Sequence, residues 1–301
     1  MSQATQHGTK TNRDEELILL FLSNQNTEST RNVYGIELRA FLRRAQKPIK
    51  DIELADILDY KSSITGLKSA TIARKLKTIR LFFGFLYAQH YIPRNPATGL
   101  KIPQVHWTEP NILTEDEAGA LLRSTKDRRT LQGRRDYAML MVLLGTGVRE
   151  SELAGANVGS LMTKWGAMFL RVLGKGGKER LVKLPTEVNE AVQEYLRARK
   201  IPGPEEALFL TMPKRGEPPR RVTPTVVDHL VSACAKRALM TKHVTPHLLR
   251  HTALSLMLAN GAELSRVSQT AGHSRTSTTA NFYVHATKET RAEDSNPLFT
   301  K

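Results

Sequence analysis

Apolar residues recur at helical spacing along most of this 301-residue chain, and one proline-rich stretch interrupts the pattern. Because proline cannot continue a helix, this stretch predicts a linker, which we place at residues 93–111. The chain length also suits two domains, which we expect at residues 14–92 and 112–301. The break consists of Pro93, Pro96, Gly99 and Pro103.

The charge of the chain is strongly positive. Lys and Arg number 45 against 29 Asp and Glu, which gives a net charge of +16 and favours a polyanionic partner, nucleic acid before an anionic membrane surface. The single cysteine, Cys234, excludes an internal disulfide and suits a reducing compartment. No secretory signal is visible at the start and no apolar run is long enough to cross a membrane, so we expect a cytoplasmic protein.

The first region predicts a small all-helical domain that follows a frayed polar start at residues 1–13. Thr27 is a suitable N-cap for the second helix, which Pro48 ends. In the fourth helix, Arg74 and Lys77 lie opposite the apolar stripe. They form either an ordinary solvated basic face or, as the charge of the whole chain favours, a DNA contact. The four helices are expected at residues 15–22, from 27 to 48, at 53–62 and from 69 onward.

The second region predicts helices around one small antiparallel sheet. Thr114, with Glu117 three residues later, forms a capping box that begins the first helix. Two strands, at residues 167–173 and 179–184, flank the turn sequence Gly-Lys-Gly-Gly-Lys. The fold class is therefore mainly α with a small antiparallel sheet. Further helices are expected at residues 134–144, 186–199, 223–238, 246–259, 263–271 and 276–285.

Four segments of the second region concentrate chemically active side chains. Arginines present forked donors that match phosphate oxygens, lysine can protonate a leaving oxygen, and tyrosine can act as a covalent nucleophile. Phosphoryl transfer needs little beyond such positioning and charge stabilisation. The segments are Gly-Val-Arg149-Glu-Ser-Glu152-Leu, the turn with Lys175 and Lys178, His247-Leu-Leu-Arg250-His251, and Ala-Gly-His273 followed ten residues later by Tyr283.

In order and spacing, these segments resemble the signature boxes of the tyrosine recombinases, also called the lambda-integrase family. The similarity covers residues from about 14 to 290 and is greatest to Xer-like and phage-integrase members without an arm-binding domain. It implies an N-terminal helical (SAM-like) core-binding domain and a mostly α catalytic domain. It also implies a site-specific recombinase that cuts and rejoins DNA through a 3′-phosphotyrosine bond, for integration, excision or resolution.

The resemblance assigns a role to each matching residue. Arg149 and Arg250 would clamp the scissile phosphate, with Glu152 in support and within reach of a local ion pair to Arg149. Lys175 would protonate the 5′-oxygen, and Lys178 is a nearby alternative. Tyr283 would be the nucleophile, since residue 282 is a phenylalanine without a hydroxyl.

The histidines have two possible interpretations. By resemblance, His247 and His273 would bind the phosphate and assist proton movement, while His251 would be structural. The spacing of His247 and His251 also matches a zinc-protease helix, but Leu248 replaces the required glutamate. A phosphate-binding P-loop fails as well, because Glu179 follows Lys178 where Ser or Thr is needed. We therefore predict no metal and no cofactor.

The implied partners are a double-stranded DNA site and three further copies of the chain, which form a tetramer on two duplexes, with accessory proteins as possible additions. Residues 290–301 are expected to dock on a neighbouring copy or to be a frayed end. A bacterial or phage-type, nucleoid-associated location would follow. Two alternatives remain: a type IB topoisomerase or telomere resolvase with the same chemistry, and a catalytically silent DNA-binding protein.

Overall fold

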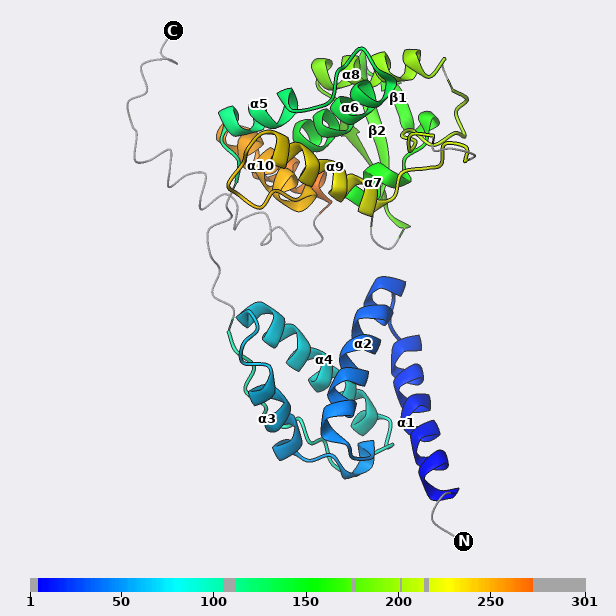
Figure 1. Ribbon diagram of the computed structural model, residues 1–301, viewed down its shortest axis with the longest axis vertical. Coiled ribbons are helices and arrows are strands. Elements are labelled where there is room, and N and C mark those ends of the chain that lie inside the picture. Colours follow the sequence, from blue (N-terminus) through cyan, green and yellow to red (C-terminus); the bar gives the residue numbers. More distant parts are fainter. Residues whose placement is uncertain (1–4, 105–111, 175–176, 201, 214–216, 273–301) are drawn as a thin grey trace, which may run out of the picture. The chain divides into compact units, whose positions relative to one another are not determined.

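The chain folds into two compact units, Met1–Thr108 and Glu109–Lys301, each with its own hydrophobic core (Figure 1). The computed structural model describes all residues except 1–4, 105–111, 175–176, 201, 214–216 and 273–301. The predicted fold class is confirmed: the described residues are mostly helical and contain one small antiparallel sheet.

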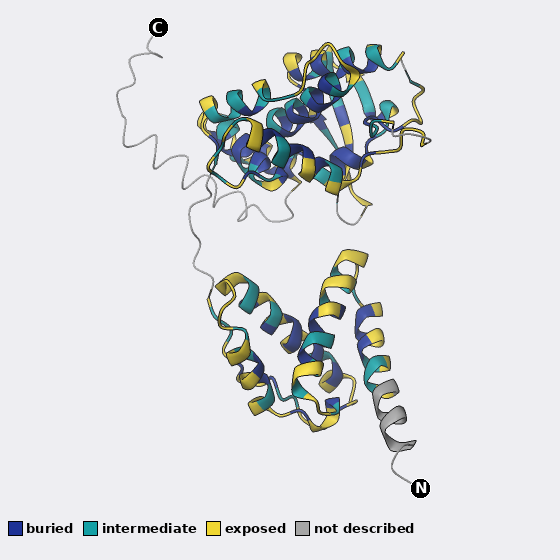
Figure 2. Cartoon of the chain, in the orientation of Figure 1, coloured by how far each residue is buried: buried dark blue, intermediate teal, exposed yellow. Residues whose placement is uncertain are grey.

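The first unit contains four α-helices whose apolar faces meet in a common core (Figure 2). Phe41, Phe82 and Phe83 are fully buried there and pack edge to face. The first helix begins at Thr5, within the segment that was expected to be frayed. The helices are α1 (Thr5–Ser23), α2 (Glu28–Ala45), α3 (Leu54–Ser63) and α4 (Ser69–Ala88), with a short 3₁₀ turn at Ile49–Asp51.

Local signals set two boundaries in this unit. The predicted N-cap of α2 is confirmed, since the Thr27 hydroxyl accepts the backbone N–H of Thr30 at 3.2 Å. The segment expected as a linker, 93–111, is not uniform. Ala97 and Leu100 are buried in the core of the first unit, so the chain still packs there after the first two prolines.

The second unit packs helices against one small sheet. The predicted capping box of α5 is confirmed, because Thr114 accepts the N–H of Glu117 while Glu117 accepts the N–H of Thr114. Helix α6 is largely buried and packs against both α8 and α10. The helices are α5 (Glu115–Arg123), α6 (Leu131–Thr146), α7 (Glu150–Gly155), α8 (Thr186–Ala198), α9 (Pro224–Arg237), α10 (Pro246–Ala259) and α11 (Leu264–Ala271). The expected helix at 276–285 lies outside the described residues.

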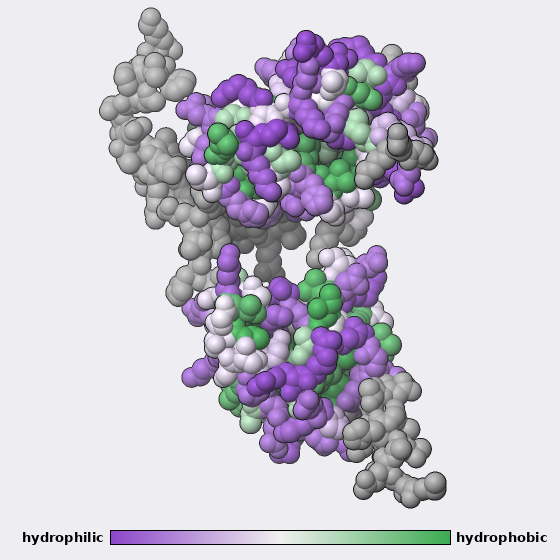
Figure 3. Space-filling view, viewed as in Figure 1, coloured by the Kyte–Doolittle hydropathy of each residue, from purple (hydrophilic) through white to green (hydrophobic). Residues whose placement is uncertain are grey.

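The sheet has three strands rather than two, in the order β1-β2-β3, and is antiparallel throughout. Strand β1 (Leu161–Lys164), which the sequence analysis missed, pairs with β2 (Ala167–Leu173), and β2 pairs with β3 (Glu179–Lys183). The pairing of Leu173 with Glu179 places the Gly-Lys-Gly-Gly-Lys turn at the end of the β2–β3 ladder. Hydrophilic residues dominate the face of both units seen in Figure 3, in agreement with the high net charge.

Candidate active site

The turn between α6 and α7 presents the first predicted arginine. Gly147 ends α6 with a φ of +65°, a left-handed conformation that glycine adopts without strain. A Cβ on Gly147 would lie 3.1 Å from the side chain of Leu254, so the close approach of this turn to α10 also favours glycine. Two residues later, Arg149 becomes the N-cap of α7.

Arg149 is tied to Glu152 by two bonds. Its backbone N–H donates to Oε2 of Glu152 at 2.9 Å, and its Nη1 donates to Oε1 at 2.8 Å. The predicted ion pair is therefore confirmed. The Glu152 side chain is only 3% exposed, whereas that of Arg149 is 35% exposed. The buried carboxylate thus fixes the position of Arg149, while part of the arginine side chain stays accessible to a ligand.

A third residue, Arg180 of β3, completes this cluster. Its Nη1 and Nη2 each donate to one oxygen of Glu152 at 2.8 Å, and its Nε donates to the carbonyl of Thr270 at 2.8 Å. Burial alone would raise the pKa of Glu152, but its bonds to Arg180 and to the Arg149 backbone hold that pKa below the ordinary value.

The sequence analysis did not single out Arg180, although a signal was present. Residues two apart in a strand face the same side of the sheet, and Val182 is buried. Strand alternation therefore turns Arg180 toward the interior, where a charged side chain needs a partner.

Helix α10 brings the second predicted arginine to the same place. Arg250 is buried, and its Nη1 and Nη2 donate to the carbonyls of Gly147 and Ala271, each at 2.6 Å. Burial, together with the positive charge of Arg149, lowers the pKa of Arg250 to about 10, which still leaves the side chain charged at neutral pH.

His247 is an exposed residue in the first turn of α10, three residues before Arg250, so both project from one side of the helix. Its Nε2 lies 2.9 Å from Nε2 of His251, so one ring donates an N–H hydrogen bond and the other accepts it. Partial desolvation and the positive charges of Arg250 and Arg149 lower the pKa of His247. The neutral imidazole therefore predominates at neutral pH.

The remaining predicted residues are less fully described. Lys178 is exposed, and its carbonyl accepts the N–H of Gly174 at 2.8 Å, which closes the β2–β3 turn. Lys175, His273 and Tyr283 lie outside the described residues, so their predicted roles stay predictions. The last described residue, Gly272, caps α11 with a φ of +62°.

The predicted DNA contacts Arg74 and Lys77 belong to the other unit and are both exposed on α4. Arg74 also forms an ion pair with the buried Glu37 of α2. It therefore has a structural partner in addition to any DNA contact, and the DNA contact stays a prediction.

The site as described suits an anionic ligand. Arg149, Arg180 and Arg250 interact with one buried carboxylate, Glu152, so positive charge is in excess. Planar arginine forks match phosphate oxygens. Within the described residues, no three His, Cys, Asp or Glu side chains are arranged to hold a metal ion, and no helix has the length and apolar character needed to cross a membrane.

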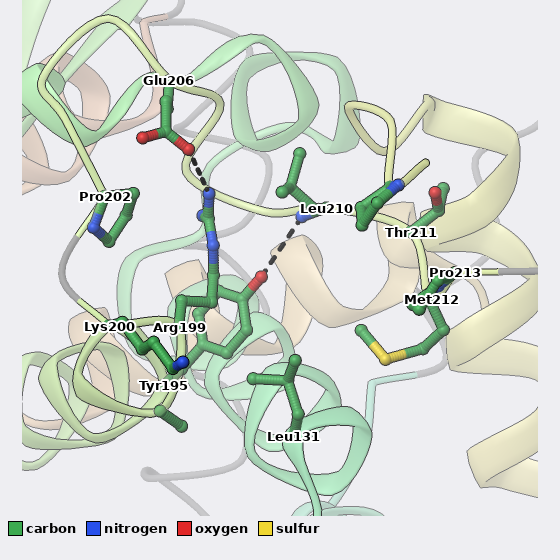
Figure 4. Close-up of a pocket in the computed structure, with 12 residues that line it drawn as sticks. Leu131, Tyr195, Arg199, Lys200, Pro202, Glu206, Leu210, Thr211, Met212 and Pro213 are labelled. Carbon is green, nitrogen blue, oxygen red and sulfur yellow. Dashed lines mark hydrogen bonds and ion pairs between the residues drawn. The ribbon is translucent and has the colours of Figure 1, made fainter. Parts of the chain in front are cut away.

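A separate hollow in the second unit contains none of the predicted site residues (Figure 4). Arg199 borders it and pairs with Glu206, while the hydroxyl of Tyr195 accepts the N–H of Leu210 at 3.3 Å. These polar groups bond to one another, as buried polar groups in a packed interior do. We therefore do not assign this hollow to the predicted site.

Comparison with known proteins identifies the family. The phage integrase family model matches residues 111–290. A tyrosine recombinase XerC of Thermodesulfovibrio yellowstonii is 33% identical over 274 residues, covering 88% of each chain. One from Listeria welshimeri is 31% identical, covering 84% of this chain and 85% of the relative.

Solved structures agree with the fold. A lambda integrase fragment bound to a core DNA site has a TM-score of 0.72 at 16% identity, covering 98% of this chain and 99% of that one. An XerH recombinase bound to its substrate has a TM-score of 0.71 at 18% identity, covering 87% of this chain and 78% of that one. The XerC relatives do not favour a topoisomerase or a silent DNA-binding protein. The chain therefore belongs to the phage integrase family, among the Xer-like tyrosine recombinases.

Proposed function

We propose that this recombinase cleaves and rejoins DNA strands at a specific site, with Tyr283 as nucleophile and with the scissile phosphate held by Arg149 and Arg250. The convergence of these two arginines on one positively charged cluster carries the proposal, since they are far apart in sequence. The partly exposed Arg149 fork is held by Glu152, and a pre-oriented donor loses little entropy when a phosphate binds.

The proposed chemistry conserves the phosphodiester energy. The Tyr283 oxygen attacks the phosphorus, the bond to the 5′-oxygen breaks, and the tyrosine proton leaves to a base. Neutral His247, with its lowered pKa, is suited to accept or relay that proton. Lys175 of the β2–β3 turn gives a proton to the departing 5′-oxygen, with Lys178 as the alternative donor. His273 adds a hydrogen bond to the phosphate. The reverse reaction, with a 5′-hydroxyl of the partner duplex, joins the strands.

Arginine placement supplies the electrostatic part of catalysis. Charge develops on the non-bridging oxygens in the transition state, and fixed cations stabilise it at little reorganisation cost. Arg250 is held by two backbone carbonyls and Arg149 by one carboxylate, so neither fork has to be ordered by the substrate.

The proposal extends to partners. We expect four protomers on two duplexes, with residues 290–301 docking on a neighbouring copy, and accessory proteins that set direction. Arg74 and Lys77, both exposed on α4, would contact phosphates on the face of the duplex that the first unit meets. A cytoplasmic, nucleoid-associated location fits a DNA substrate.

Covalent capture tests the proposal. The protein is incubated with fragmented, nicked DNA from its source and denatured with SDS, and the attached DNA is sequenced. Adducts at one defined site that disappear in Tyr283→Phe would support it. Adducts that persist in Tyr283→Phe would contradict the choice of nucleophile, and native binding without adducts in either protein would contradict the cleavage activity.

A further inference from the structure

Arg180 makes contacts that none of the proposed cleavage steps uses. Its guanidinium uses both terminal nitrogens on Glu152 and its Nε on the carbonyl of Thr270. These partners are 28 and 90 residues away in sequence. One side chain of β3 therefore joins the start of α7 to the end of α11.

We propose that Arg180 is a positioning residue of the cleavage site, which holds Glu152, and through it Arg149, in fixed register with the end of α11. The proposal rests on the cleavage function argued above. It adds a fourth side chain to the arrangement of Arg149, Glu152 and Arg250, one that does not itself need to touch the DNA.

The geometry at Glu152 supports this role. Arg180 binds both carboxylate oxygens in a fork, so the carboxylate plane cannot rotate without breaking a bond. Oε1 of Glu152 also accepts Nη1 of Arg149 at 2.8 Å. Because one oxygen serves both arginines, the direction of the Arg149 fork depends on Arg180.

The end of α11 gives a second, independent support. The carbonyls of Thr270 and Ala271 accept Arg180 and Arg250 respectively, so two arginines hold consecutive residues of the last turn. Helix carboxyl ends carry partial negative charge and favour such cations. A Cβ on Gly272 would lie 3.0 Å from Cζ of Arg180, so glycine is what allows the guanidinium to lie there. Residue 273 follows directly in sequence.

Arg199 provides a matched structural comparison in the same unit. It too donates to backbone carbonyls, those of Ala207 and Leu208. It also donates to a carboxylate, that of Glu206, as Figure 4 shows. Its side chain is 6% exposed against 15% for Arg180. The two arginines thus have partners of the same kinds, although Glu206 is exposed and Glu152 is buried, and only Arg180 shares its carboxylate with a predicted phosphate-binding residue.

The test compares Arg180→Lys with Arg199→Lys on a nicked duplex that carries the captured site. Lysine keeps the charge but cannot form the fork. A displacement of about 1 Å can lower a reaction rate on the order of 100-fold. We therefore expect Arg180→Lys to form covalent adduct about 10- to 100-fold more slowly per bound duplex, with DNA affinity within about twofold. Arg199→Lys should cleave at the unsubstituted rate, and thermal unfolding of both variants shows whether each is folded.

A second pair of variants keeps the test independent of the folding of Arg180→Lys. Both glycines have a positive φ, +62° at Gly272 and +82° at Gly261, so alanine strains the backbone at either position. Only at Gly272 would the added methyl group also displace the guanidinium of Arg180, because no atom lies within 4 Å of a Cβ on Gly261. Only Gly272→Ala should slow adduct formation.

Equal cleavage rates within each pair would overturn the role of Arg180, as would equal slowing by both members. The Tyr283→Phe control in the same assay separates this outcome from failure of the proposed function. Loss of adduct in that variant establishes the nucleophile whatever Arg180 does.

Discussion

Each unit, within its described residues, buries one glutamate, and the two carboxylates have different surroundings. Glu37 of α2 accepts the hydroxyl of Thr78 at 2.7 Å and pairs with Arg74, and both partners belong to α4. Glu152 of α7 binds Arg149 of its own turn and Arg180 of a distant strand. The first carboxylate joins two helices of a bundle, and the second joins segments of the site.

This difference shows what a buried charge can be used for. Replacing a complete buried ion pair with apolar residues often costs nothing in stability, so such pairs are weak evidence of a stabilising role. The surplus of arginines over carboxylates at Glu152 leaves net positive charge, as the proposed phosphate site requires. At Glu37, the carboxylate meets one half-exposed arginine and one hydroxyl, so the described contacts there form no such surplus of arginines.

The largest expected effect comes from Glu152→Gln, with Glu37→Gln as its matched control. The amide keeps one acceptor oxygen but carries no negative charge, and its NH2 group replaces an oxygen that accepts from these arginines, beside the positive charge of Arg250. We expect adduct formation per bound duplex to fall on the order of 100-fold. Removing one partner of a buried pair also costs about 3 kcal/mol of unfolding free energy.

Glu37→Gln should lower the unfolding free energy of the first unit and leave the adduct rate per bound duplex nearly unchanged. Single-turnover cleavage and urea unfolding measure both quantities. If the two variants lose cleavage equally, the distinction between the two carboxylates is wrong.

The pH dependence of stability should also distinguish Glu152. Its pKa is lowered in the folded chain from an ordinary value of 4.5, so it stabilises the fold fully above that value. That contribution is lost as the pH falls below 4.5 and through the lower folded pKa. The gap in unfolding free energy between the unsubstituted chain and Glu152→Gln should therefore be wide at neutral pH and narrow in acid. Urea titrations at about pH 6 and about pH 3.5 measure it. A gap that widens in acid would contradict the network.

Substitutions of the two basic residues on α4 should have smaller effects than those at Glu152. Arg74→Gln and Lys77→Gln should each weaken DNA binding across all sequences and reduce the salt slope by about 1, if both side chains contact phosphates. Only Arg74→Gln should also lower the stability of the first unit, by about 1 kcal/mol, since only Arg74 pairs with Glu37. Affinities measured over a salt series check the first effect and thermal unfolding the second. If the dependence of DNA affinity on salt is the same in Lys77→Gln as in the unsubstituted chain, Lys77 does not contact the DNA.

Local sequence signals predicted much of this fold. Thr27 and Thr114 marked helix starts because capping depends on residues within one turn. Strand β1 was missed because four residues are too short to display a period. Ala97 was assigned to the linker because its burial depends on packing between helices, which the nearby prolines do not reveal.

The site likewise contains residues that the sequence predicted and one that it did not. The residues of the signature boxes were predicted by resemblance, and the Arg149–Glu152 pair followed from their three-residue spacing. Arg180 was missed because its partners, Glu152 and the carbonyl of Thr270, are adjacent only in the folded chain. Strand alternation could have indicated that it faces inward, but not which groups it meets.

The most direct test of the account is to map the residue that carries the DNA. Captured adducts are digested with nuclease and protease, and the nucleotide-bearing peptide is identified by mass spectrometry. We predict a single peptide, with the phosphate on Tyr283 and joined to the 3′-end of the nucleotide. A phosphate on any other residue, or joined to a 5′-end, would contradict the proposed mechanism.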